Sequence, residues 1–473
     1  MPLIKSISGI RGTIGGVQGE NLTPQDIIRF TTAYVLFIKQ NNPNIKVKIV
    51  VGRDARISGE MIKNLVVGAL VSQGANAIDL GLASTPTVEM AVLSQKAQGG
   101  IIISASHNPQ GWNALKLLDG QGEFLTKIAG EKVLALAEQI NFPAVSEDQL
   151  GFYILNPFLT HNHLEEILNL ELVDKNLIAS RNFKVVVDGI NSVGGMIVPE
   201  LLKMLGVKDI VELNCEPNGI FAHKPEPLAE NLTQIMEKVK AEKADLGIVV
   251  DPDVDRLAFV MENGEMLSEE YTLVAVADYV LANFESVNAK NSGRYNKSTV
   301  SNLSSSRALK DITEKHGGTY EAAAVGEVNV VTLMKKNKCV IGGEGNGGVI
   351  FPELHYGRDA LVGIALFLSY LAKRNIKISE LKRELPEYFM VKDKIELTSN
   401  INVKEIMEKI RSDYASEKIT DIDGLKIDWP DSWVHLRASN TEPIIRVYAE
   451  AKTMAQAEAK VKEIKDKILA YIK

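Results

Sequence analysis

Residues 104–109 place a serine where it could carry out group transfer. The run Ser-Ala-Ser-His-Asn-Pro directly follows the apolar stretch 100–103, a pattern typical of a buried strand that ends at a loop. Open α/β sheets bind ligands at such strand ends. Ser106 lies beside His107, whose imidazole could hold an anion, and Lys116 could supply a positive charge or accept a proton. A serine in this setting could be a nucleophile or a phosphate carrier, although short polar clusters are also common turns.

Three carboxylates alternate along the chain directly after a second strand-like stretch, at Asp251, Asp253 and Asp255. They would repel one another unless a cation neutralised them. Mg²⁺ suits such a site because it takes oxygen ligands, needs few protein carboxylates and keeps room for water and phosphate oxygens. An EF-hand calcium loop is one alternative, but its sixth position requires glycine and this chain has Arg256 there. A solvated acidic turn is the other alternative.

Two further runs carry groups suited to a polar ligand. Five glycines between residues 342 and 348 would let the backbone approach a ligand closely, and Glu344 and Asn346 among them suit hydrogen bonds to sugar hydroxyls. Near the C-terminus, a guanidinium, two hydroxyls, an amide and successive backbone N–H groups form a candidate phosphate cradle. Its side chains are those of Arg437, Ser439, Asn440 and Thr441, with Arg446 beyond them. Taken alone, each run is equally typical of an ordinary turn.

The first three runs occupy the same place in a repeated pattern. Units that open near residues 47, 184 and 298 alternate strand-like with helical stretches, and the third strand of each leads to Ser106, Asp251 or Glu344. This alternation is typical of parallel sheets with crossover helices. The sequence therefore predicts an α/β fold of three similar domains with mostly parallel sheets, a C-terminal α+β domain, and loops that converge on a central cleft.

Linkers and changes of pattern give the expected domain boundaries. The first domain should cover residues 1–151, and the second 152–263, ending at the hairpin signal Asn263-Gly264. The third should cover residues 264–386 and the C-terminal domain 387–473. A chain of 473 residues suits roughly three to four domains.

The four runs, in this order and spacing, resemble those of the α-D-phosphohexomutase family, which includes phosphoglucomutases, phosphomannomutases and phosphoglucosamine mutases. The phosphoserine, magnesium, sugar-selecting and phosphate loops of that family resemble residues 104–109, 251–256, 343–347 and 437–443. Shorter similarities lie at residues 9–12, 52–54, 58–59, 85–86 and 225–227. The resemblance spans nearly the whole chain and implies an active site in the central cleft.

This resemblance implies an isomerase that acts as an intramolecular phosphotransferase between the 1- and 6-positions of a hexose phosphate. Ser106 would carry the phosphate, and one Mg²⁺ would be held by Ser106 together with Asp251, Asp253 and Asp255. The phosphate would pass to the free hydroxyl and give a hexose 1,6-bisphosphate. That intermediate would turn round and return its other phosphate to the serine. The bisphosphate would also be the activator.

The same resemblance implies roles for the remaining site residues. Lys116 and Arg11 are candidates for proton transfer and for stabilising transition-state charge, and lysine is the better base because its pKa is more easily lowered. Arg256 would lie beside the transferred group. His107 would shape the serine loop or act in acid–base chemistry. The sugar hydroxyls and the non-reacting phosphate would contact Glu344, Asn346, Arg437, Ser439, Asn440, Thr441 and Arg446.

Two positions depart from the sugar loop of many members of the family, which reads Gly-Glu-x-Ser-Gly-His. Asn346 replaces the serine, and Gly348 replaces the histidine, a group that some members could use for proton transfer or phosphate contact. The glycine-rich variant resembles the branch that includes phosphoglucosamine mutases. The main expectation is therefore the conversion of glucosamine 6-phosphate to glucosamine 1-phosphate, with phosphoglucomutase or phosphomannomutase activity as the alternative.

Two functions of other kinds compete with this interpretation. A non-catalytic sugar-phosphate-binding protein on the same fold would not need Ser106, Lys116 and three aspartates together. An alkaline-phosphatase-like hydrolase would usually need several histidine metal ligands. The chain has seven histidines, and its one close pair, His161 and His163, lies away from the acidic run.

Composition narrows the expected partners and compartment. The chain is 45% hydrophobic and 24% charged, with a formal net charge of -7, which is ordinary for a globular protein and predicts no basic face for nucleic acid. Cys215 and Cys339 make no disulfide framework. The N-terminus lacks the apolar core of a signal peptide, and the longest apolar stretch, 361–372, is too short to span a bilayer. We expect a cytoplasmic monomer or homodimer whose partner is a small hexose phosphate, with no nucleic acid or membrane partner.

Overall fold

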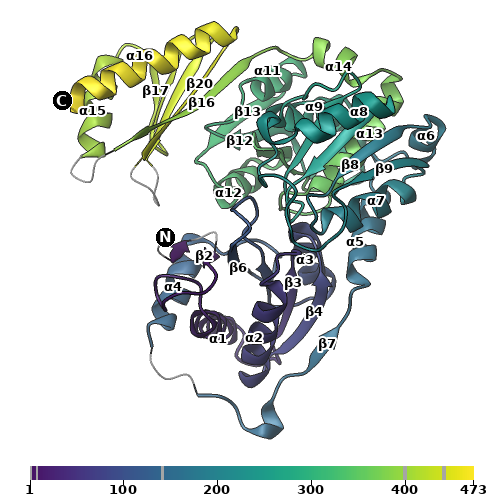
Figure 1. Ribbon diagram of the computed structural model, residues 1–473, viewed down its shortest axis with the longest axis vertical. Coiled ribbons are helices and arrows are strands. Elements are labelled where there is room, and N and C mark those ends of the chain that lie inside the picture. Colours follow the sequence, from purple (N-terminus) through teal and green to yellow (C-terminus); the bar gives the residue numbers. More distant parts are fainter. Residues whose placement is uncertain (1–2, 7–8, 140–142, 398–401, 439–443, 473) are drawn as a thin grey trace.

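The computed structural model describes residues 3–6, 9–139, 143–397, 402–438 and 444–472, which form four successive sheets with their helices (Figure 1). The first sheet, in purple and blue, lies at the bottom of that view, and the last, in yellow and green, lies at the upper left beside the third. Within the described ranges, no helix is both long enough and apolar enough to cross a membrane.

The first sheet has seven strands. In chain order, its elements are β1 (Ile4–Ser6), β2 (Gly9–Thr13), α1 (Pro24–Asn41), β3 (Lys48–Arg53), α2 (Gly59–Ser72), β4 (Asn76–Leu82), α3 (Thr85–Ser94), β5 (Gly99–Ile103), β6 (Trp112–Leu118), α4 (Lys127–Ala137), a 3₁₀ helix (Glu147–Gln149) and β7 (Tyr153–Leu155). The spatial order is β1-β2-β6-β5-β3-β4-β7. The helices begin at side-chain caps where the sequence offers them: Thr23 and Asp26 form a capping box at α1, and Ser84 caps α3.

The second and third sheets have four strands each. The second unit contains α5 (Leu159–Leu168), α6 (Lys175–Ser180), β8 (Lys184–Asp188), α7 (Gly194–Met204), β9 (Asp209–Leu213), a 3₁₀ helix (Ala229–Asn231), α8 (Thr233–Glu242), β10 (Leu246–Val250) and β11 (Leu257–Met261). The third contains α9 (Glu269–Ala282), α10 (Phe284–Lys290), β12 (Asn296–Asn302), α11 (Ala308–Lys315), β13 (Thr319–Ala323), α12 (Glu327–Asn337), β14 (Cys339–Glu344), β15 (Gly348–Ile350), α13 (Ala360–Arg374) and α14 (Ile378–Glu384).

The predicted repeat is confirmed in the strand order. The three sheets share the arrangements β4-β3-β5-β6, β9-β8-β10-β11 and β13-β12-β14-β15. In each, three parallel strands are followed by one antiparallel strand beside the third. The second and third sheets are therefore mostly parallel, as predicted, with one antiparallel strand each, and the first also adds the antiparallel strands β1 and β2. The chemistry-bearing loop of every unit joins the third parallel strand to the antiparallel one.

The strands that lead into these loops are buried along their whole length. β5, β10 and β14 consist of glycine and apolar residues apart from the final Glu344, and every residue in them is buried. Near-continuous apolar runs are typical of strands covered on both faces. These strands give each loop a rigid starting point at the edge of its sheet.

The second and third units share one apolar core. It runs from Leu164 on α5 to Leu385 after α14, and it includes residues of both sheets. The rings of Phe259 on β11 and Phe367 on α13 stack across the boundary with their centroids 3.9 Å apart. Because interiors are closely packed, this continuous core fixes the second sheet relative to the third.

The C-terminal unit is an antiparallel sheet with its own core, as an α+β domain requires. Its elements are β16 (Phe389–Glu396), α15 (Val403–Asp413), β17 (Lys418–Thr420), β18 (Leu425–Asp428), β19 (Trp433–Ala438), β20 (Ile444–Ala451) and α16 (Met454–Ile472). Polar pairs join it to the third unit: Lys392 Nζ lies 2.9 Å from Glu269 Oε1, and the Arg307 N–H donates to Glu450 Oε1 at 2.9 Å. Polar interfaces of this kind permit relative domain motion.

Two segments extend the sheets past the domain boundaries expected from the sequence. The first sheet continues past residue 151, because β7 adds in parallel to the edge strand β4. The second sheet continues past Gly264, because the Leu267 N–H donates to the Phe259 carbonyl and Met266 bridges Val260. Hydrogen bonding to a sheet edge, which the chain composition does not reveal, accounts for both differences.

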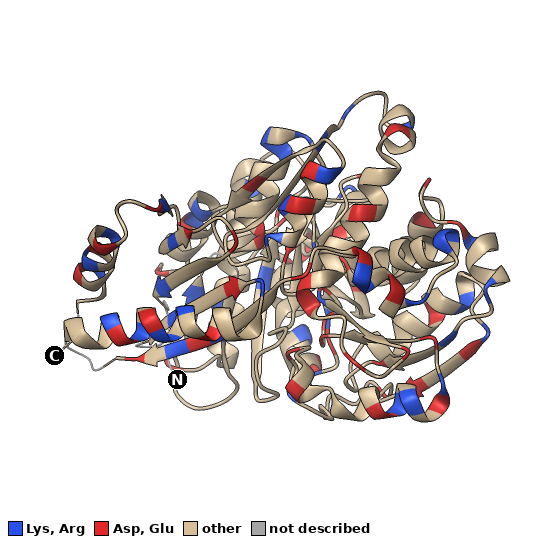
Figure 2. Cartoon of the chain, turned by 90° about the horizontal axis from the view of Figure 1, so that it is seen from above, with Lys and Arg blue, Asp and Glu red and all other residues tan. Residues whose placement is uncertain are grey.

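Charged residues of both signs are distributed over the outer elements. Figure 2 shows Lys and Arg interspersed with Asp and Glu along the visible helices, including the long C-terminal helix α16. The face seen there carries mixed charge, in keeping with the modest formal net charge of -7.

Candidate active site

Ser106 lies in the loop between β5 and β6 with a left-handed backbone. Its φ of +46° is uncommon for a residue with a side chain, and such conformations persist where the surroundings fix them. The Ser106 N–H donates to Ser104 Oγ at 2.9 Å, and Ser106 Oγ donates to Asp251 Oδ2 at 2.7 Å. Ser106 is 7% exposed. The serine of the first sheet thus directly contacts the acidic loop of the second.

Arg56 holds the serine loop in shape, a role that the sequence did not reveal. Its side chain is fully buried and pairs with Asp54 at 3.0 Å. Asp54 also accepts a 2.8 Å hydrogen bond from Ser104 Oγ. The guanidinium donates hydrogen bonds to the backbone carbonyls of Ser106, Asn108, Pro109, Gln110 and Trp112. A buried donor group with this many acceptors specifies one conformation of the loop.

The three predicted aspartates converge in the loop between β10 and β11. Asp251, Asp253 and Asp255 are 0% exposed, and one carboxylate oxygen of each lies within 4.8 Å of the others. Asp251 Oδ1 accepts from the backbone N–H groups of Asp255 and Arg256, which curls the loop around it. Because this segment is buried and hydrogen-bonded to Gly347, to Ala360 at the start of α13 and to Ser106, neither an EF-hand nor a solvated acidic turn describes it.

The aspartate cluster fits a hard divalent cation. Asp253 Oδ1 and Asp255 Oδ1 are buried without a hydrogen-bond partner among the described residues. Burial raises the pKa of the Asp251 carboxyl well above its usual range, and the negative charges of Asp255 and Asp253 raise it further. Bringing Mg²⁺ to these oxygens would satisfy them and remove the repulsion between the carboxylates.

Two cations already balance part of this negative charge. Lys116 Nζ on β6 lies 2.6 Å from Asp253 Oδ2 and 3.7 Å from Asp255 Oδ2. Arg358 Nη2 donates to Asp255 Oδ2 at 2.7 Å. Burial alone would lower the pKa of Lys116, but Asp253 and Asp255 outweigh it and raise that pKa. In this structure Lys116 is therefore a charged partner of the aspartates, and the proton transfer expected of it stays a prediction.

Further positive groups gather on the serine side of the cluster. Burial and then the neighbouring Arg256 lower the pKa of Arg11. The pKa of His107 is well below its usual value, because the positive charge of Arg256, burial and the positive charge of Arg11 all disfavour the imidazolium. Arg11 Nη1 also lies 3.4 Å from Asn108 Oδ1. Cationic groups that depress one another's pKa values in this way form a site suited to an anion.

The glycine-rich loop between β14 and β15 packs directly against the aspartate loop. The Leu257 N–H donates to the Gly347 carbonyl at 3.0 Å. A Cβ on Gly347, whose φ is +89°, would lie 2.3 Å from the Leu257 carbonyl oxygen, and a Cβ on Gly345 would lie 1.8 Å from Glu270 Oε2. These glycines are required for close approach and a left-handed turn, rather than for a flexible loop.

Glu344 and Asn346 point to different partners in this loop. Glu344 is buried, accepts from Asn302 Nδ2 at 2.7 Å and pairs with Arg358 at 2.9 Å. Burial would raise the pKa of Glu344, but Arg358 and Asn302 lower it. Asn346 is half-buried, and its Oδ1 has no hydrogen-bond partner among the described residues. Glu344 thus lies in the network around Arg358, whereas Asn346 Oδ1 is a buried acceptor that no described protein group satisfies.

The C-terminal unit presents a row of cations across its sheet. Lys394, Arg446 and Arg437 are direct cross-strand partners on β16, β20 and β19, so they share one face. Arg437 Nε is 2.9 Å from Asp423, and the two residues help line a hollow of about 410 Å³. Like charges placed opposite one another are unfavourable without an anion. Ser439, Asn440 and Thr441 lie outside the described residues.

The structure therefore brings most of the predicted residues together around Ser106 and the three aspartates. The group from the first three units consists of Ser106, His107, Arg11, Lys116, Asp251, Asp253, Asp255, Arg256, Glu344 and Asn346. Arg437 and Arg446 lie on the C-terminal sheet. Sequence reasoning missed Arg56, Arg358 and Lys394. The only local signal for Arg358 is Asp359 after it, which caps α13 by accepting from the Leu361 and Val362 N–H groups.

Comparison with protein families accounts for all four units. Four models match in succession: phosphoglucomutase/phosphomannomutase alpha/beta/alpha domain I at residues 4–144, domain II at 161–264, domain III at 269–389 and the C-terminal domain at 391–467. Together they cover most of the chain, in the order in which the sheets occur.

Individual proteins are similar over their full length. A phosphoglucomutase/phosphomannomutase of Thermococcus kodakarensis is 37% identical, over 94% of this chain and 95% of the relative. A phosphoglucosamine/phosphogalactosamine mutase of Sulfurisphaera tokodaii is 34% identical, over 96% and 98%. The crystal structure of a phosphoglucomutase/phosphomannomutase family protein of Burkholderia thailandensis superposes with a TM-score of 0.81 and 25% identity, covering 99% of this chain and 98% of that one. The chain therefore belongs to the phosphoglucomutase/phosphomannomutase family of isomerases that move phosphate within hexose phosphates.

Proposed function

We propose that this phosphohexomutase works through a phosphate carried on Ser106. The single observation that carries the proposal is the 2.7 Å hydrogen bond from Ser106 Oγ to Asp251, one of three buried carboxylates. A hydroxyl that only caps a turn has no need of a buried acidic cluster from another sheet. A phosphoserine at this point would be close to both the cation site and the positive groups of Arg11 and Arg256.

The chemistry is a transfer in two halves. The bond between phosphorus and Ser106 Oγ breaks as a bond from phosphorus to the free hydroxyl oxygen of the sugar forms. In the net reaction the proton of that hydroxyl ends on Ser106 Oγ, and the product is a hexose 1,6-bisphosphate. After the bisphosphate turns round, its other phosphate returns to Ser106. Asp251, Asp253, Asp255 and the serine oxygen would hold one Mg²⁺. When bound, this ion stabilises the negative charge that develops on the phosphoryl group.

The remaining residues supply charge and orientation. Lys116 and Arg358 hold Asp253 and Asp255 in place, so that their unsatisfied oxygens face the cation. Arg11 and Arg256 stabilise the phosphoryl group from the other side, and His107 shapes the loop that presents the serine. Asn346 Oδ1 accepts from a sugar hydroxyl, and Glu344 acts from within the Arg358 network.

The C-terminal unit holds the phosphate that is not reacting. Arg437 and Arg446, with Ser439, Asn440 and Thr441, form the phosphate loop, and Lys394 extends the row of cations. Because this unit contacts the third through polar pairs, it can close over the substrate and exclude water, and then relax while the bisphosphate turns.

We infer that glucosamine 6-phosphate is the preferred substrate and glucosamine 1-phosphate its product, with glucose or mannose phosphates as the alternative. The glycine-rich sugar loop with Asn346 and Gly348, and the name of the 34% identical relative, support this choice. Sugar phosphates are charged and do not cross membranes freely, so we place the enzyme in the cytoplasm, as a monomer or homodimer. We infer no nucleic-acid partner.

The substrate choice predicts a preference that steady-state kinetics can measure. Glucosamine 6-phosphate, glucose 6-phosphate, mannose 6-phosphate and N-acetylglucosamine 6-phosphate should be compared, each with a trace of its own 1,6-bisphosphate as activator. The highest kcat/KM should belong to glucosamine 6-phosphate. A higher kcat/KM for the glucose or mannose compound would contradict the assignment of glucosamine 6-phosphate as the preferred substrate. It would not affect the proposed phosphoserine mechanism.

The mechanism predicts that the purified protein carries phosphate on Ser106. Intact-mass and peptide mass spectrometry would locate it. Ser106→Ala should lose activity by several orders of magnitude while its thermal unfolding stays close to wild type, because the covalent route is removed. Ser146→Ala, at an exposed serine, is the matched control and should keep full activity. Phosphate found only on another residue of a fully active enzyme would refute the assignment.

The aspartate cluster predicts a dependence on Mg²⁺. Treatment with a chelator should abolish turnover, and added Mg²⁺ should restore it. Asp253→Asn should raise the Mg²⁺ concentration needed for half-maximal activity and lower kcat, because a hard cation loses an oxygen ligand. Asp209→Asn, on an exposed position of β9, serves as the control. Undiminished turnover after complete removal of divalent ions would show that the cluster does not serve phosphoryl transfer.

The cation row predicts a combined effect on binding and closure. Arg437→Ala should raise KM and lower kcat together, with kcat/KM reduced roughly 10- to 100-fold, as expected for a lost charged hydrogen bond. It should also release more free bisphosphate per turnover. Arg411→Ala, on the exposed side of α15, should change neither quantity. If Arg437→Ala had the same KM, kcat and bisphosphate release as the wild type, this residue would not bind the phosphate.

A further inference from the structure

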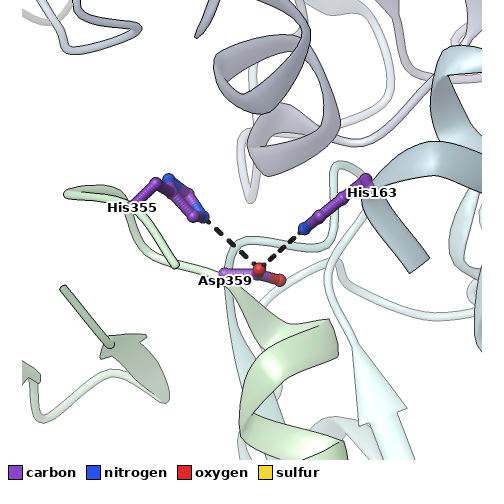
Figure 3. A group of neighbouring side chains, drawn as sticks. All are labelled: His163, His355 and Asp359. Carbon is purple, nitrogen blue, oxygen red and sulfur yellow. Dashed lines mark hydrogen bonds and ion pairs between the residues drawn. The ribbon is translucent and has the colours of Figure 1, made fainter. Parts of the chain in front are cut away.

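A second cluster of metal-binding side chains lies outside the proposed active site. Figure 3 shows His163, His355 and Asp359, with dashed lines from both imidazoles meeting at one carboxylate oxygen. His163 comes from α5, His355 from the loop after β15, and Asp359 from the start of α13. The three side chains are buried, with 0%, 3% and 0% of their surfaces exposed. Residues far apart in sequence are thus brought together with little access to water.

The distances within the cluster match those between ligands of one metal ion. His163 Nε2 lies 3.0 Å from Asp359 Oδ2, and His355 Nε2 lies 3.4 Å from the same oxygen. One ligand atom from each residue lies within 4.8 Å of the others. In a tetrahedral zinc site with bonds of about 2.0 Å, neighbouring ligand atoms are roughly 3.3 Å apart. Both measured distances are close to that separation.

The opposite nitrogen of each imidazole is held by a separate polar group. His163 Nδ1 lies 3.0 Å from Thr87 Oγ1, and His355 Nδ1 lies 3.3 Å from the buried Glu89 carboxylate. A Cβ at Gly357 would lie 1.8 Å from Glu89 Oε2, so glycine there lets Glu89 reach His355. Histidine ligands of metals commonly donate their second N–H to such partners, which leaves Nε2 as the atom that can bind a metal once it has lost its own proton.

Asp359 is oriented in the same way. Its Oδ1 accepts from the backbone N–H groups of Leu361 and Val362 at the start of α13, at 2.8 Å and 3.3 Å. This cap leaves Oδ2 turned toward the two imidazoles. All three side chains therefore present one ligand atom inward and have their other polar atom fixed from outside.

We propose that His163 Nε2, His355 Nε2 and Asp359 Oδ2 bind one Zn²⁺, or a similar borderline transition-metal ion, separate from the Mg²⁺ cluster. Two imidazoles and one carboxylate suit such ions rather than Mg²⁺, which prefers oxygen ligands. Binding releases to solvent the Nε2 protons that the two imidazoles donate to Asp359 when no metal is present.

The position of this site points to a structural role beside the catalytic machinery. His163 belongs to the second unit, whereas His355 and Asp359 belong to the third, so the ion would join these two units. Thr87 and Glu89 on α3 would connect it to the first unit through the two imidazoles. Asp359 directly follows Arg358, which contacts Asp255. Zinc at this point would hold Arg358 where the aspartate loop needs it.

Metal analysis of the full-length protein tests the proposal. Protein stripped with a chelator and returned to buffer with millimolar Mg²⁺ is titrated with Zn²⁺ against a chromophoric chelator, and with Co²⁺ to read coordination from visible absorption. We expect one Zn²⁺ per chain and the intense bands of tetrahedral Co²⁺. His163→Asn should remove both signals, and His161→Asn, the exposed histidine on the same helix, should keep them. Asp251→Asn should also keep them, which separates this site from the Mg²⁺ cluster.

A milder pair of variants covers the case in which His163→Asn does not fold. Thr87→Val and Glu89→Gln remove only the groups that hold the imidazoles, and each should weaken Zn²⁺ binding roughly 10- to 100-fold. Equal Zn²⁺ binding in wild type and folded His163→Asn, or unchanged affinity in both milder variants, would overturn the proposal. So would the absence of Zn²⁺ binding by wild type, which would leave the cluster as a hydrogen-bonded contact alone.

Discussion

The organisation of this site depends on three carboxylates buried within 4.8 Å of one another. Their mutual repulsion in a water-poor interior would exclude the arrangement unless positive charge came from elsewhere. Lys116 from the first unit and Arg358 from the third both reach the cluster. The need to balance this charge couples three sheets that are separate in sequence. Ser106 then meets Asp251 at the point where the three sheets converge.

The threefold repeat explains how a chain can build such a centre. Each unit ends its third parallel strand in the same place and returns through an antiparallel strand, so three loops with different chemistry emerge from similar supports. The serine loop needs additional fixing because Ser106 has a positive φ, and the buried Arg56–Asp54 pair provides it. The shared core of the second and third units fixes the position of the aspartate loop relative to the glycine-rich loop. The C-terminal sheet stands apart from this rigid body, joined by polar pairs.

Much of this was accessible from the sequence, because strands buried on both faces and followed by polar loops leave a local pattern. The repeat and its three chemistry-bearing loops could be predicted in this way. Arg56 and Arg358 could not, because their importance lies in partners 50 and 103 positions away. The short strand β7 was missed for a similar reason: its residues are exposed, and only pairing with β4 makes it a strand.

The electrostatics were the least predictable part. A lysine near a serine suggests a base, yet the pKa of Lys116 is raised because two aspartates from another unit contact it. The glycines at 345 and 347 suggest close approach to a ligand, yet the groups that approach them too closely for any side chain are Glu270 and Leu257 of the protein itself. In both cases residue types and spacing identified the site, and the tertiary contacts decided what each residue does there.

The central claim is that the phosphate on Ser106 is the group transferred to the sugar. It is tested most directly by a single-turnover chase of enzyme labelled with ³²P on Ser106, mixed with unlabelled hexose monophosphate. The account predicts that the label leaves the protein at the rate of the first turnover and appears first in the hexose bisphosphate. Label that remains on Ser106 while product forms, or that is released only as inorganic phosphate, would contradict it.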